Sequence, residues 1–165
     1  MKIFKIILAF IILTLTLNAN TKPEKRFFSK NFYLYDTEFK KVAKIYDLPF
    51  ILLKAVALTE NHRFNANKKR DNKNKTKDYG LMQINTIWLK EEGLSEKEIL
   101  KPVKNIEIGA KILKGLIKRN GYSWNTIGKY HSSTPEFKKI WLERIQENMR
   151  LLIQFDKKYK YVVKN

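Results

Sequence analysis

The sequence predicts a mainly α-helical protein with one folded domain, and three observations support this prediction. Apolar residues recur every three to four positions in several segments, and no segment alternates convincingly between apolar and polar residues. Hydrophobic residues make up 44% of the 165 residues, which is enough to form a core. The length fits a single domain, and no internal repeat is present.

The chain begins with the pattern of a secretory signal peptide, predicted to cover residues 1–19. Two lysines precede an apolar stretch from Ile6 to Leu17, and the small residue Ala19 ends the pattern. The stretch is shorter than the roughly 20 apolar residues that span a bilayer. An uncleaved N-terminal anchor is the alternative, and in either case the rest of the chain crosses a membrane.

The remainder of the chain divides into three predicted parts: a polar lead-in (residues 20–36), the folded domain (37–155) and a basic tail (156–165). Because the sequence has no cysteine, we expect neither a disulfide nor a lipid on the leader. The net charge of +18 favours polyanionic partners, which beyond an export signal are wall polymers and membrane surfaces rather than nucleic acid. The alternative is that the charge only aids solubility. We expect a periplasmic monomer.

Two helices are predicted up to Glu60. The first covers residues 37–46, with Thr37 as its N-cap. Asp47 is the expected cap of the second helix, and Pro49 lies near its first turn. Residues 50–60 contain eight apolar residues out of eleven, so this helix belongs in the centre of the domain.

Polar residues dominate the next segment, residues 61–77, which contains seven basic residues, one acid and five asparagines. It is predicted to be a solvated loop. A short helix is expected over residues 86–90. Ser95 followed by Glu98 forms a capping box for another short helix, which ends before Pro102.

Two further helices precede the longest one. Asn105 is expected to cap a helix that ends near Arg119, with Gly121 just beyond its end. Ser123 is expected to cap a short helical segment that reaches Tyr130.

The longest helix is predicted to begin at Thr134-Pro135, a cap followed by a first-turn proline. Trp141 is assigned to the core, whereas Trp88 and Trp124 are left open between core packing and stacking on sugars. The apolar stripe of this helix consists of Phe137, Trp141, Ile145, Met149 and Leu152 or Phe155.

Glu60 is the first candidate catalytic residue, because it lies at the polar end of the most apolar helix. Both the surrounding core and the negative end of the helix dipole disfavour an ionised carboxylate there. A carboxylic acid that keeps its proton near neutral pH is what general acid catalysis requires. The alternative is a surface glutamate paired with Arg63, three residues further on.

The segment of residues 78–85, DYGLMQIN, is the second candidate region. Gly80 favours a tight turn or a close approach of the backbone to a ligand. Met82 offers adaptable apolar surface, and Gln83 offers an amide that can bond sugar hydroxyls and acetamides. The residues assigned here to the core are Leu81 and Ile84.

Four ordered motifs carry the most specific signal in the chain. They are Ala57-Leu58-Thr59-Glu60-Asn61, the GLMQIN run from Gly80 to Asn85, Asn105-Ile106-Glu107-Ile108-Gly109 with Leu113, and Ile127-Gly128-Lys129-Tyr130-His131. Together they resemble the lysozyme-like lytic transglycosylases over about residues 48–145. Within that family the chain is most similar to small single-domain members that accompany type III and type IV secretion systems, pili and conjugation machinery. The resemblance implies a lysozyme-like fold, peptidoglycan glycan strands as the substrate, and no cofactor or metal.

The resemblance also implies a reaction. Glu60 would protonate the glycosidic oxygen between N-acetylmuramic acid and N-acetylglucosamine, and would then act as base for the muramyl C6 hydroxyl. That hydroxyl attacks C1 and leaves a 1,6-anhydro sugar. Ordinary glycosidases need a second carboxylate. None is evident in the sequence, and here the substrate's own hydroxyl, held near C1, supplies the nucleophile.

Roles for other residues follow from the same resemblance. The hydroxyl of Tyr130 is expected to point toward Glu60, Asn105 to give structural support, and Gly109 to allow close helix packing. The residues expected to line the glycan groove are Gly80, Leu81, Met82 and Gln83, and Tyr130 is also expected to bind the substrate.

Two positions depart from the family pattern. Asn61 follows the catalytic glutamate where serine is usual, and it is retained as a substrate-binding residue because its amide can still form hydrogen bonds. His131 stands where asparagine is common. We expect His131 to pack or form a hydrogen bond rather than bind a metal, because His62 is the only other histidine.

Two other functions remain open from the sequence. A hydrolytic muramidase would use the same glutamate but let water attack the sugar. A non-catalytic glycan-binding factor would recruit a secretion apparatus through its basic surface. Charge alone also suggests a nucleic-acid-binding or membrane-active protein, which the motifs do not support.

Overall fold

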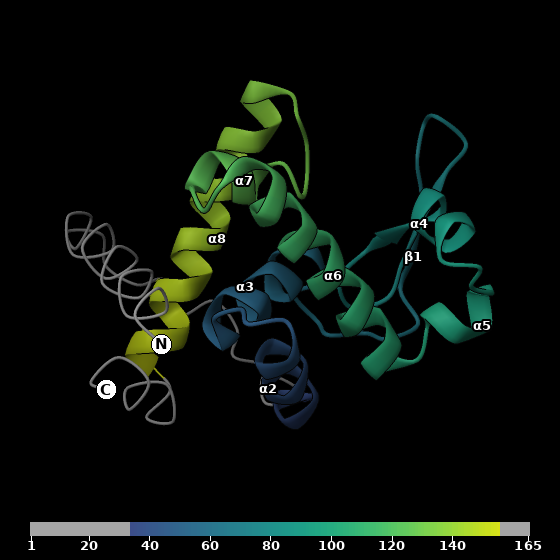
Figure 1. Cartoon of the computed structure of the whole chain (residues 1–165), viewed down its shortest axis with the longest axis horizontal. Helices are drawn as coiled ribbons and strands as arrows, with labels where there is room; N and C mark the ends of the chain where they lie inside the picture. Colours follow the sequence, from purple (N-terminus) through teal and green to yellow (C-terminus); the bar gives the residue numbers. More distant parts are fainter. Residues whose placement is uncertain (1–33, 156–165) are drawn as a thin grey trace.

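Helix α3 (Phe50–Glu60) runs through the middle of the domain, as its composition predicts (Figure 1). Every residue of this helix from Ile51 to Ala57 is buried, because neighbouring elements cover it on all sides. Helix α8 (Pro135–Phe155) packs along it. The computed structural model describes residues 34–155. The predicted leader, most of the predicted lead-in and the predicted basic tail therefore lie outside the described residues.

Helix α2 (Asp36–Ile45) packs against α3 and against α6 (Pro102–Asn120). Its N-cap is Tyr35, which has a left-handed backbone with φ 63°, so the predicted cap at Thr37 is wrong. Helix α3 follows Pro49 directly, without a side-chain cap, so the predicted cap at Asp47 is also wrong.

Helix α6 begins four residues earlier than predicted, since its N-cap is Lys101 and not Asn105. Pro102 occupies its first turn, where a proline loses no intrahelical hydrogen bond. Asn105 therefore lies inside the helix, and its fully buried side chain bonds to another segment instead of capping. The predicted end is close to correct, since the helix stops at Asn120 and Gly121 follows with φ 74°.

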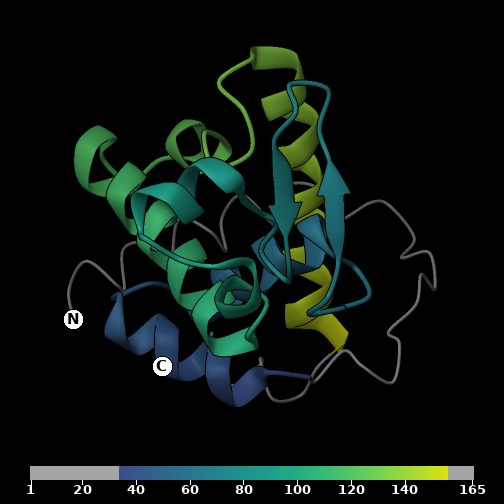
Figure 2. The same cartoon turned by 90° about the vertical axis from the view of Figure 1, so that its right-hand side faces the viewer.

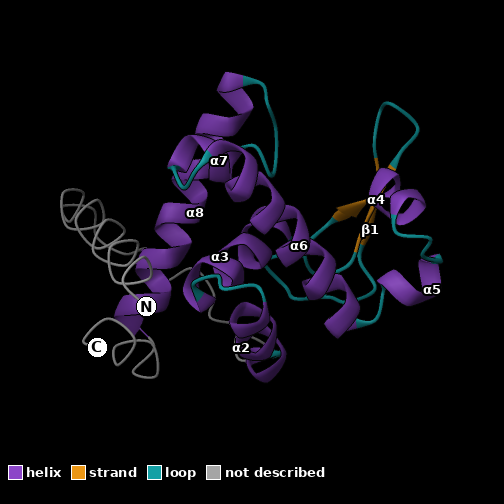
Figure 3. Ribbon diagram, viewed as in Figure 1, coloured by secondary structure: helices purple, strands orange, loops and turns teal. Residues whose placement is uncertain are grey.

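In the view of Figures 1 and 3, a small antiparallel sheet lies to the right of α6, close to α4. Its strands are β1 (Lys69–Asp71), β2 (Lys77–Tyr79) and β3 (Ile84–Asn85), in the order β1-β2-β3. The prediction of a solvated loop over residues 61–77 is therefore wrong in part. Strands of two or three residues are too short to show a period of two, and all three residues of β1 are exposed.

Two short helices have the caps that the sequence predicts. Ser95 and Glu98 form the capping box of α5 (Glu96–Ile99), and Ser123 caps α7 (Trp124–Gly128). Helix α4 (Thr86–Glu91) has Asn85 as its cap, which the sequence analysis did not name. Figure 2 shows the strands standing in front of the helical body, and α4 and α5 connect them to α6.

The apolar stripe of α8 is confirmed from Trp141 onward. Trp141, Ile145, Met149 and Leu152 are buried, whereas Phe137 is 62% exposed because the first turn of the helix extends past the core. Within residues 34–155, none of the helices combines the length and the apolar character needed to cross a lipid bilayer.

Candidate active site

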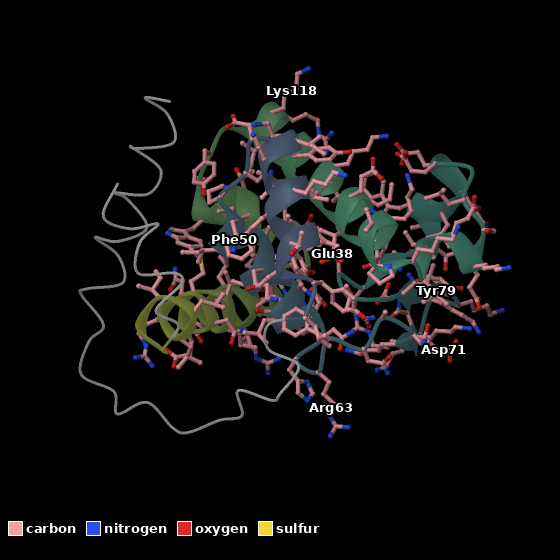
Figure 4. All side chains as sticks on the ribbon, turned by 90° about the horizontal axis from the view of Figure 1, so that it is seen from below. Glu38, Phe50, Arg63, Asp71, Tyr79 and Lys118 are labelled. Atoms are coloured by element: carbon pink, nitrogen blue, oxygen red, sulfur yellow. The ribbon has the colours of Figure 1, made fainter. Side chains whose placement is uncertain are left out.

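Glu60 is the last residue of α3, and its carboxylate faces inward. The residue is 8% exposed. The indole Nε1 of Trp141 donates to its Oε1 at 2.8 Å, and the imidazole Nδ1 of His131 lies 3.2 Å from the same oxygen. The surface pair with Arg63 is wrong, because Arg63 is exposed and projects from the edge of the molecule (Figure 4).

A polar cleft with a volume of about 260 Å³ opens at Glu60. Helices α3, α4 and α6, the sheet and the segment before α8 each contribute to its wall. Trp88 lies in this wall, which leaves stacking on a sugar open to it, whereas Trp124 is packed against the core. The lining residues are Glu60, Arg70, Asn72, Asn74, Thr76, Asp78, Gln83, Ile84, Asn85, Trp88, Ile112, Tyr130 and His131.

Asp78 brings a second carboxylate into this cleft. Antiparallel pairing sets it between Arg70 on β1 and Asn85 on β3, so the three side chains share one face of the sheet. Arg70 Nη2 donates to Oδ2 at 2.7 Å, and Asn85 Nδ2 donates to Oδ1 at 2.7 Å. The inference that the site lacks a second carboxylate is therefore wrong. The sequence did not show it because the strands were not predicted.

The turn between β2 and β3 has an unusual backbone at two positions. Gly80 has φ 74°, and a Cβ there would lie 2.3 Å from Asn105 Nδ2, so only glycine fits. Gln83 also has a left-handed backbone, with φ 48°, which costs energy in a residue other than glycine. Asn105 fixes the turn, accepting from Met82 N at 2.7 Å and donating to Tyr79 O at 2.9 Å.

Gln83 is the member of this turn whose side chain reaches the cleft. Its Nε2 donates to the carbonyl of Gly80 at 2.8 Å. Its Oε1 is buried and accepts no hydrogen bond from the described residues. A buried acceptor in a cleft wall is suited to receive an N–H or O–H group from a ligand.

The other predicted groove residues lie behind the cleft surface. Leu81 and Met82 are fully buried, so their side chains support the wall from within instead of facing the cleft. Met82 packs on Gly109, where an added Cβ would lie 2.7 Å from Met82 Cε, so this glycine allows the turn, and not a second helix, to pack closely on α6. Ile84, assigned to the core, is 1% exposed and also borders the cleft.

Asn61 occupies a position just beside the site. It is 2% exposed, and its amide group bonds to backbone on two segments. Nδ2 donates to Asn65 O at 2.7 Å and to Gly80 O at 3.1 Å, while Oδ1 accepts from Asn65 N at 3.2 Å. These bonds tie the end of α3 to the turn that carries Gln83.

Tyr130 bonds to the backbone and not to Glu60. The hydroxyl, expected to point toward Glu60, donates to Met82 O at 3.0 Å. Burial and the negative charges of Glu60 and Asp78 raise the pKa of this phenol well above its usual value. The neutral hydroxyl thus holds the wall turn in place.

Two aromatic residues contact the carboxylate of Glu60, a partner that the sequence did not assign to either of them. His131 was expected to pack or form a hydrogen bond, and it does both: its ring stacks on Trp141 at 5.5 Å, with an interplanar angle of 7°. Trp141 is 3% exposed, as predicted for the core, yet its indole N–H bonds to the carboxylate. Helical spacing predicts burial but cannot show where the N–H points.

Lys68 adds a cation close to the end of α3. Its Nζ donates to the backbone carbonyl of Glu60 at 2.6 Å. Burial lowers the pKa of this amine, and the charge of Arg70 lowers it further. Among residues 34–155 no group of three or more His, Asp or Glu side chains is arranged to hold a metal ion.

Comparisons with known proteins agree with the four motifs. A family model described as the transglycosylase SLT domain matches residues 37–148. Invasion protein IagB of Salmonella typhimurium (strain SL1344) is 34% identical over 117 residues, covering 66% of this chain and 72% of that protein. Protein IpgF of Shigella flexneri is 36% identical over 103 residues, covering 60% and 67%. A peptidoglycan-binding-like protein of Escherichia coli O157:H7 is 41% identical over 91 residues, covering 49% and 54%.

Proposed function

Because the chain belongs to the transglycosylase SLT domain family and has its lysozyme-like fold, we propose that it is a peptidoglycan lytic transglycosylase. It would cleave the β-1,4 bond between N-acetylmuramic acid and N-acetylglucosamine and leave 1,6-anhydromuramyl ends. The observation that carries this proposal is the carboxylate of Glu60, which is held through one oxygen at the wall of a polar cleft.

Glu60 would act first as acid and then as base. Both contacts to the carboxylate engage Oε1, so Oε2 is the oxygen available to carry a proton to the glycosidic oxygen. As the C1–O bond breaks, the carboxylate takes the proton of the muramyl C6 hydroxyl. The C6 oxygen then bonds to C1 of the same sugar and closes the anhydro ring. Whether Glu60 holds its proton near neutral pH stays a prediction.

The cleft wall supports binding of a glycan. Its side chains are mainly amides, hydroxyls and charged groups, which suit sugar hydroxyls and acetamides. Gln83 Oε1, buried and without a donor among the described side chains, would accept from an acetamide N–H or a hydroxyl. Trp88 would offer an apolar face to a sugar ring.

A hydrolytic muramidase is the second candidate, and Asp78 is the observation that favours it. This carboxylate lies in the same cleft as Glu60, and glycosidases that use water or a covalent intermediate need two carboxylates. However, both oxygens of Asp78 are bonded to neighbours on the sheet, to Arg70 and Asn85. We therefore favour a structural and electrostatic role for Asp78 in transglycosylation.

We also propose where the protein acts. The predicted leader would export it to the periplasm, where peptidoglycan is its substrate and a monomer suffices. Similarity to proteins named for invasion supports a role beside a secretion, conjugation or pilus machine, with local opening of the wall as its purpose.

Product analysis on purified peptidoglycan tests the proposal. Wild-type protein should release muropeptides with 1,6-anhydromuramyl ends, identified by mass spectrometry, and Glu60→Gln should lower the rate by about 10³-fold because the acid is lost. Glu143→Gln, an exposed carboxylate on α8, is the matched control and should keep wild-type activity. Reducing muramyl ends that disappear in Asp78→Asn would establish hydrolysis instead. Full function of Glu60→Gln would favour the non-catalytic glycan-binding factor.

A further inference from the structure

His131 is the titratable side chain that directly contacts the carboxylate of Glu60. Its Nδ1 lies 3.2 Å from Glu60 Oε1, and its side chain is 31% exposed, compared with 6% for that of the glutamate. We propose that His131 is a positioning residue that competes with Glu60 for a proton, and so restricts the acid form of Glu60 to lower pH. The effect on catalysis rests on the proposed function, whereas the proton competition itself does not.

The geometry decides which partner donates. The indole Nε1 of Trp141 carries a hydrogen and can only donate, so Glu60 Oε1 is an acceptor in that bond. The same oxygen can accept a second donor. We therefore assign the hydrogen in the second contact to His131 Nδ1, and two donors on one oxygen stabilise the carboxylate form of Glu60.

The surroundings favour the shared proton on the imidazole. In water an imidazole binds a proton more tightly than a carboxylate does. The ring of His131 retains access to solvent and stacks on Trp141, whose face attracts a cation. Burial of Glu60 opposes this distribution, but its two hydrogen-bond donors offset much of the desolvation cost.

Other charged groups of the cleft act on both partners. Lys68, which bonds to the carbonyl of Glu60, favours a carboxylate there. Asp78 favours protons on its neighbours, although Arg70 neutralises part of its charge. Tyr130 stays neutral because the pKa of its phenol is raised, so it contributes no charge. Of these groups, His131 is the one whose side chain contacts the carboxylate of Glu60 directly.

The consequence is a defined order of protonation. The first proton taken up by the pair resides on His131, as an imidazolium beside an anionic Glu60. Glu60 becomes an acid only when a second proton arrives from solvent, or when Nδ1 transfers its proton to Oε1. Because the imidazolium repels the second proton, the two steps are coupled and the acid form of Glu60 is populated at lower pH. With asparagine at position 131, a donor would remain and this competition would not.

An NMR titration of the two histidine side chains tests the proton competition without an activity measurement. The chain has only two histidines, and His62 is exposed and serves as the internal control. In Glu60→Gln the imidazolium of His131 loses its anionic partner, so its titration midpoint should fall by about one pH unit. The midpoint of His62 should not move. An unchanged midpoint for His131 would overturn the proposal.

The pH dependence of kcat/KM tests the catalytic consequence. Compared with wild type, His131→Asn should keep activity to a pH about one unit higher, because a donor without a titratable group replaces the imidazole. His131→Phe keeps a ring to stack on Trp141 but no donor. It should show the same shift together with a lower maximum rate.

The outcomes separate the two proposals. A uniform loss at every pH in His131→Asn, with no shift of the profile, would mean a merely structural role and would overturn the inference. Absence of anhydromuramyl products at every pH, together with the expected histidine shift, would refute the proposed function and leave the proton competition standing.

Discussion

Lys54 and Glu60 are both buried charged residues on helix α3, yet their surroundings differ. The side chain of Lys54 is fully buried, and its Nζ donates to Asp36 Oδ1 at 2.7 Å and to Leu34 O at 2.8 Å. The same ammonium lies over the rings of Phe39 and Phe64, 5.0 and 4.4 Å from their centroids. The interior of the helical body thus surrounds this charge with partners.

At the C-terminal end of the same helix, the charged group has bonded partners on one side only. Glu60 has donors on Oε1 from Trp141 and His131, and the side of the carboxylate that faces the cleft is left to a ligand. A buried charge with partners all around holds segments together, whereas a buried charge with partners on one side is prepared for chemistry. The comparison predicts that changes near Lys54 affect stability and that changes at Glu60 affect activity.

The largest expected loss of stability comes from Asp36→Asn. It removes the carboxylate that lies 2.7 Å from the buried ammonium of Lys54, which should lower the free energy of unfolding by about 3 kcal/mol. Removal of both charges in Lys54→Met/Asp36→Asn should restore more than half of this loss, because the buried ammonium is removed together with this carboxylate. Urea denaturation measures both values.

Two controls sharpen this test. Glu38→Gln removes the other acid in the first turn of α2, so it controls for the helix dipole and should change stability by less than about 0.5 kcal/mol. Glu60→Gln should leave stability near that of wild type while activity is lost. Equal destabilisation by Asp36→Asn and Glu60→Gln would contradict the distinction between the two ends of α3.

An intermediate effect is expected where the two regions meet, at Gly109. A Cβ at this position would lie 2.7 Å from Met82 Cε and 2.9 Å from Met82 Cβ, so Gly109→Ala should cost about 1–3 kcal/mol. It should also lower activity per folded molecule, because Met82 belongs to the turn that carries Gln83. Denaturation and peptidoglycan digestion measure the two effects.

Gly115→Ala is the matched control on the same helix. The nearest atom to its added Cβ is the mobile end of Arg119, at 3.3 Å. Alanine favours a helix over glycine by up to about 1 kcal/mol, so this variant should be as stable as wild type or more stable. Loss of stability without loss of activity in Gly109→Ala would mean that the core does not position the cleft.

The helical body was largely predictable from the sequence. The apolar run of α3, the apolar stripe of α8 and local caps such as Ser95 and Ser123 depend on neighbouring residues in the chain, so the sequence is enough to find them. Glu60 was found in the same way, from its position at the end of α3.

The wall of the cleft opposite α3 could not be predicted in the same way. Asp78 entered the site through the register of three very short strands, which no sequence period reveals. Trp141 and His131 reach Glu60 from residues distant in the chain, and only tertiary packing decides where their N–H groups point. The resemblance to a family supplied Tyr130, but not its hydrogen-bond partner, the carbonyl of Met82.

The smallest effect is expected from Tyr122→Phe. Unlike Lys54, the buried hydroxyl of Tyr122 is not surrounded by hydrogen-bond partners among the described residues, and unlike Glu60 it does not lie at the cleft. The hydroxyl of Tyr122 is buried and makes no hydrogen bond to the described residues, so its removal at pH 7 should change stability by less than about 0.5 kcal/mol. Tyr130→Phe, which removes the bond to Met82 O, should cost about 1 kcal/mol.

The pH dependence of the stability of Tyr122→Phe provides a second test. Burial raises the pKa of Tyr122 above its usual value, whereas tyrosine in the unfolded chain ionises near pH 10. The folded state therefore binds more protons above pH 10. The contribution of Tyr122 to stability is full below pH 10 and is lost as the pH rises through the folded value. Tyr122→Phe should then lose less stability than wild type between pH 9 and pH 11. If Tyr122→Phe lowered the free energy of unfolding at pH 7 more than Tyr130→Phe does, the hydroxyl of Tyr122 would have to bond to a partner.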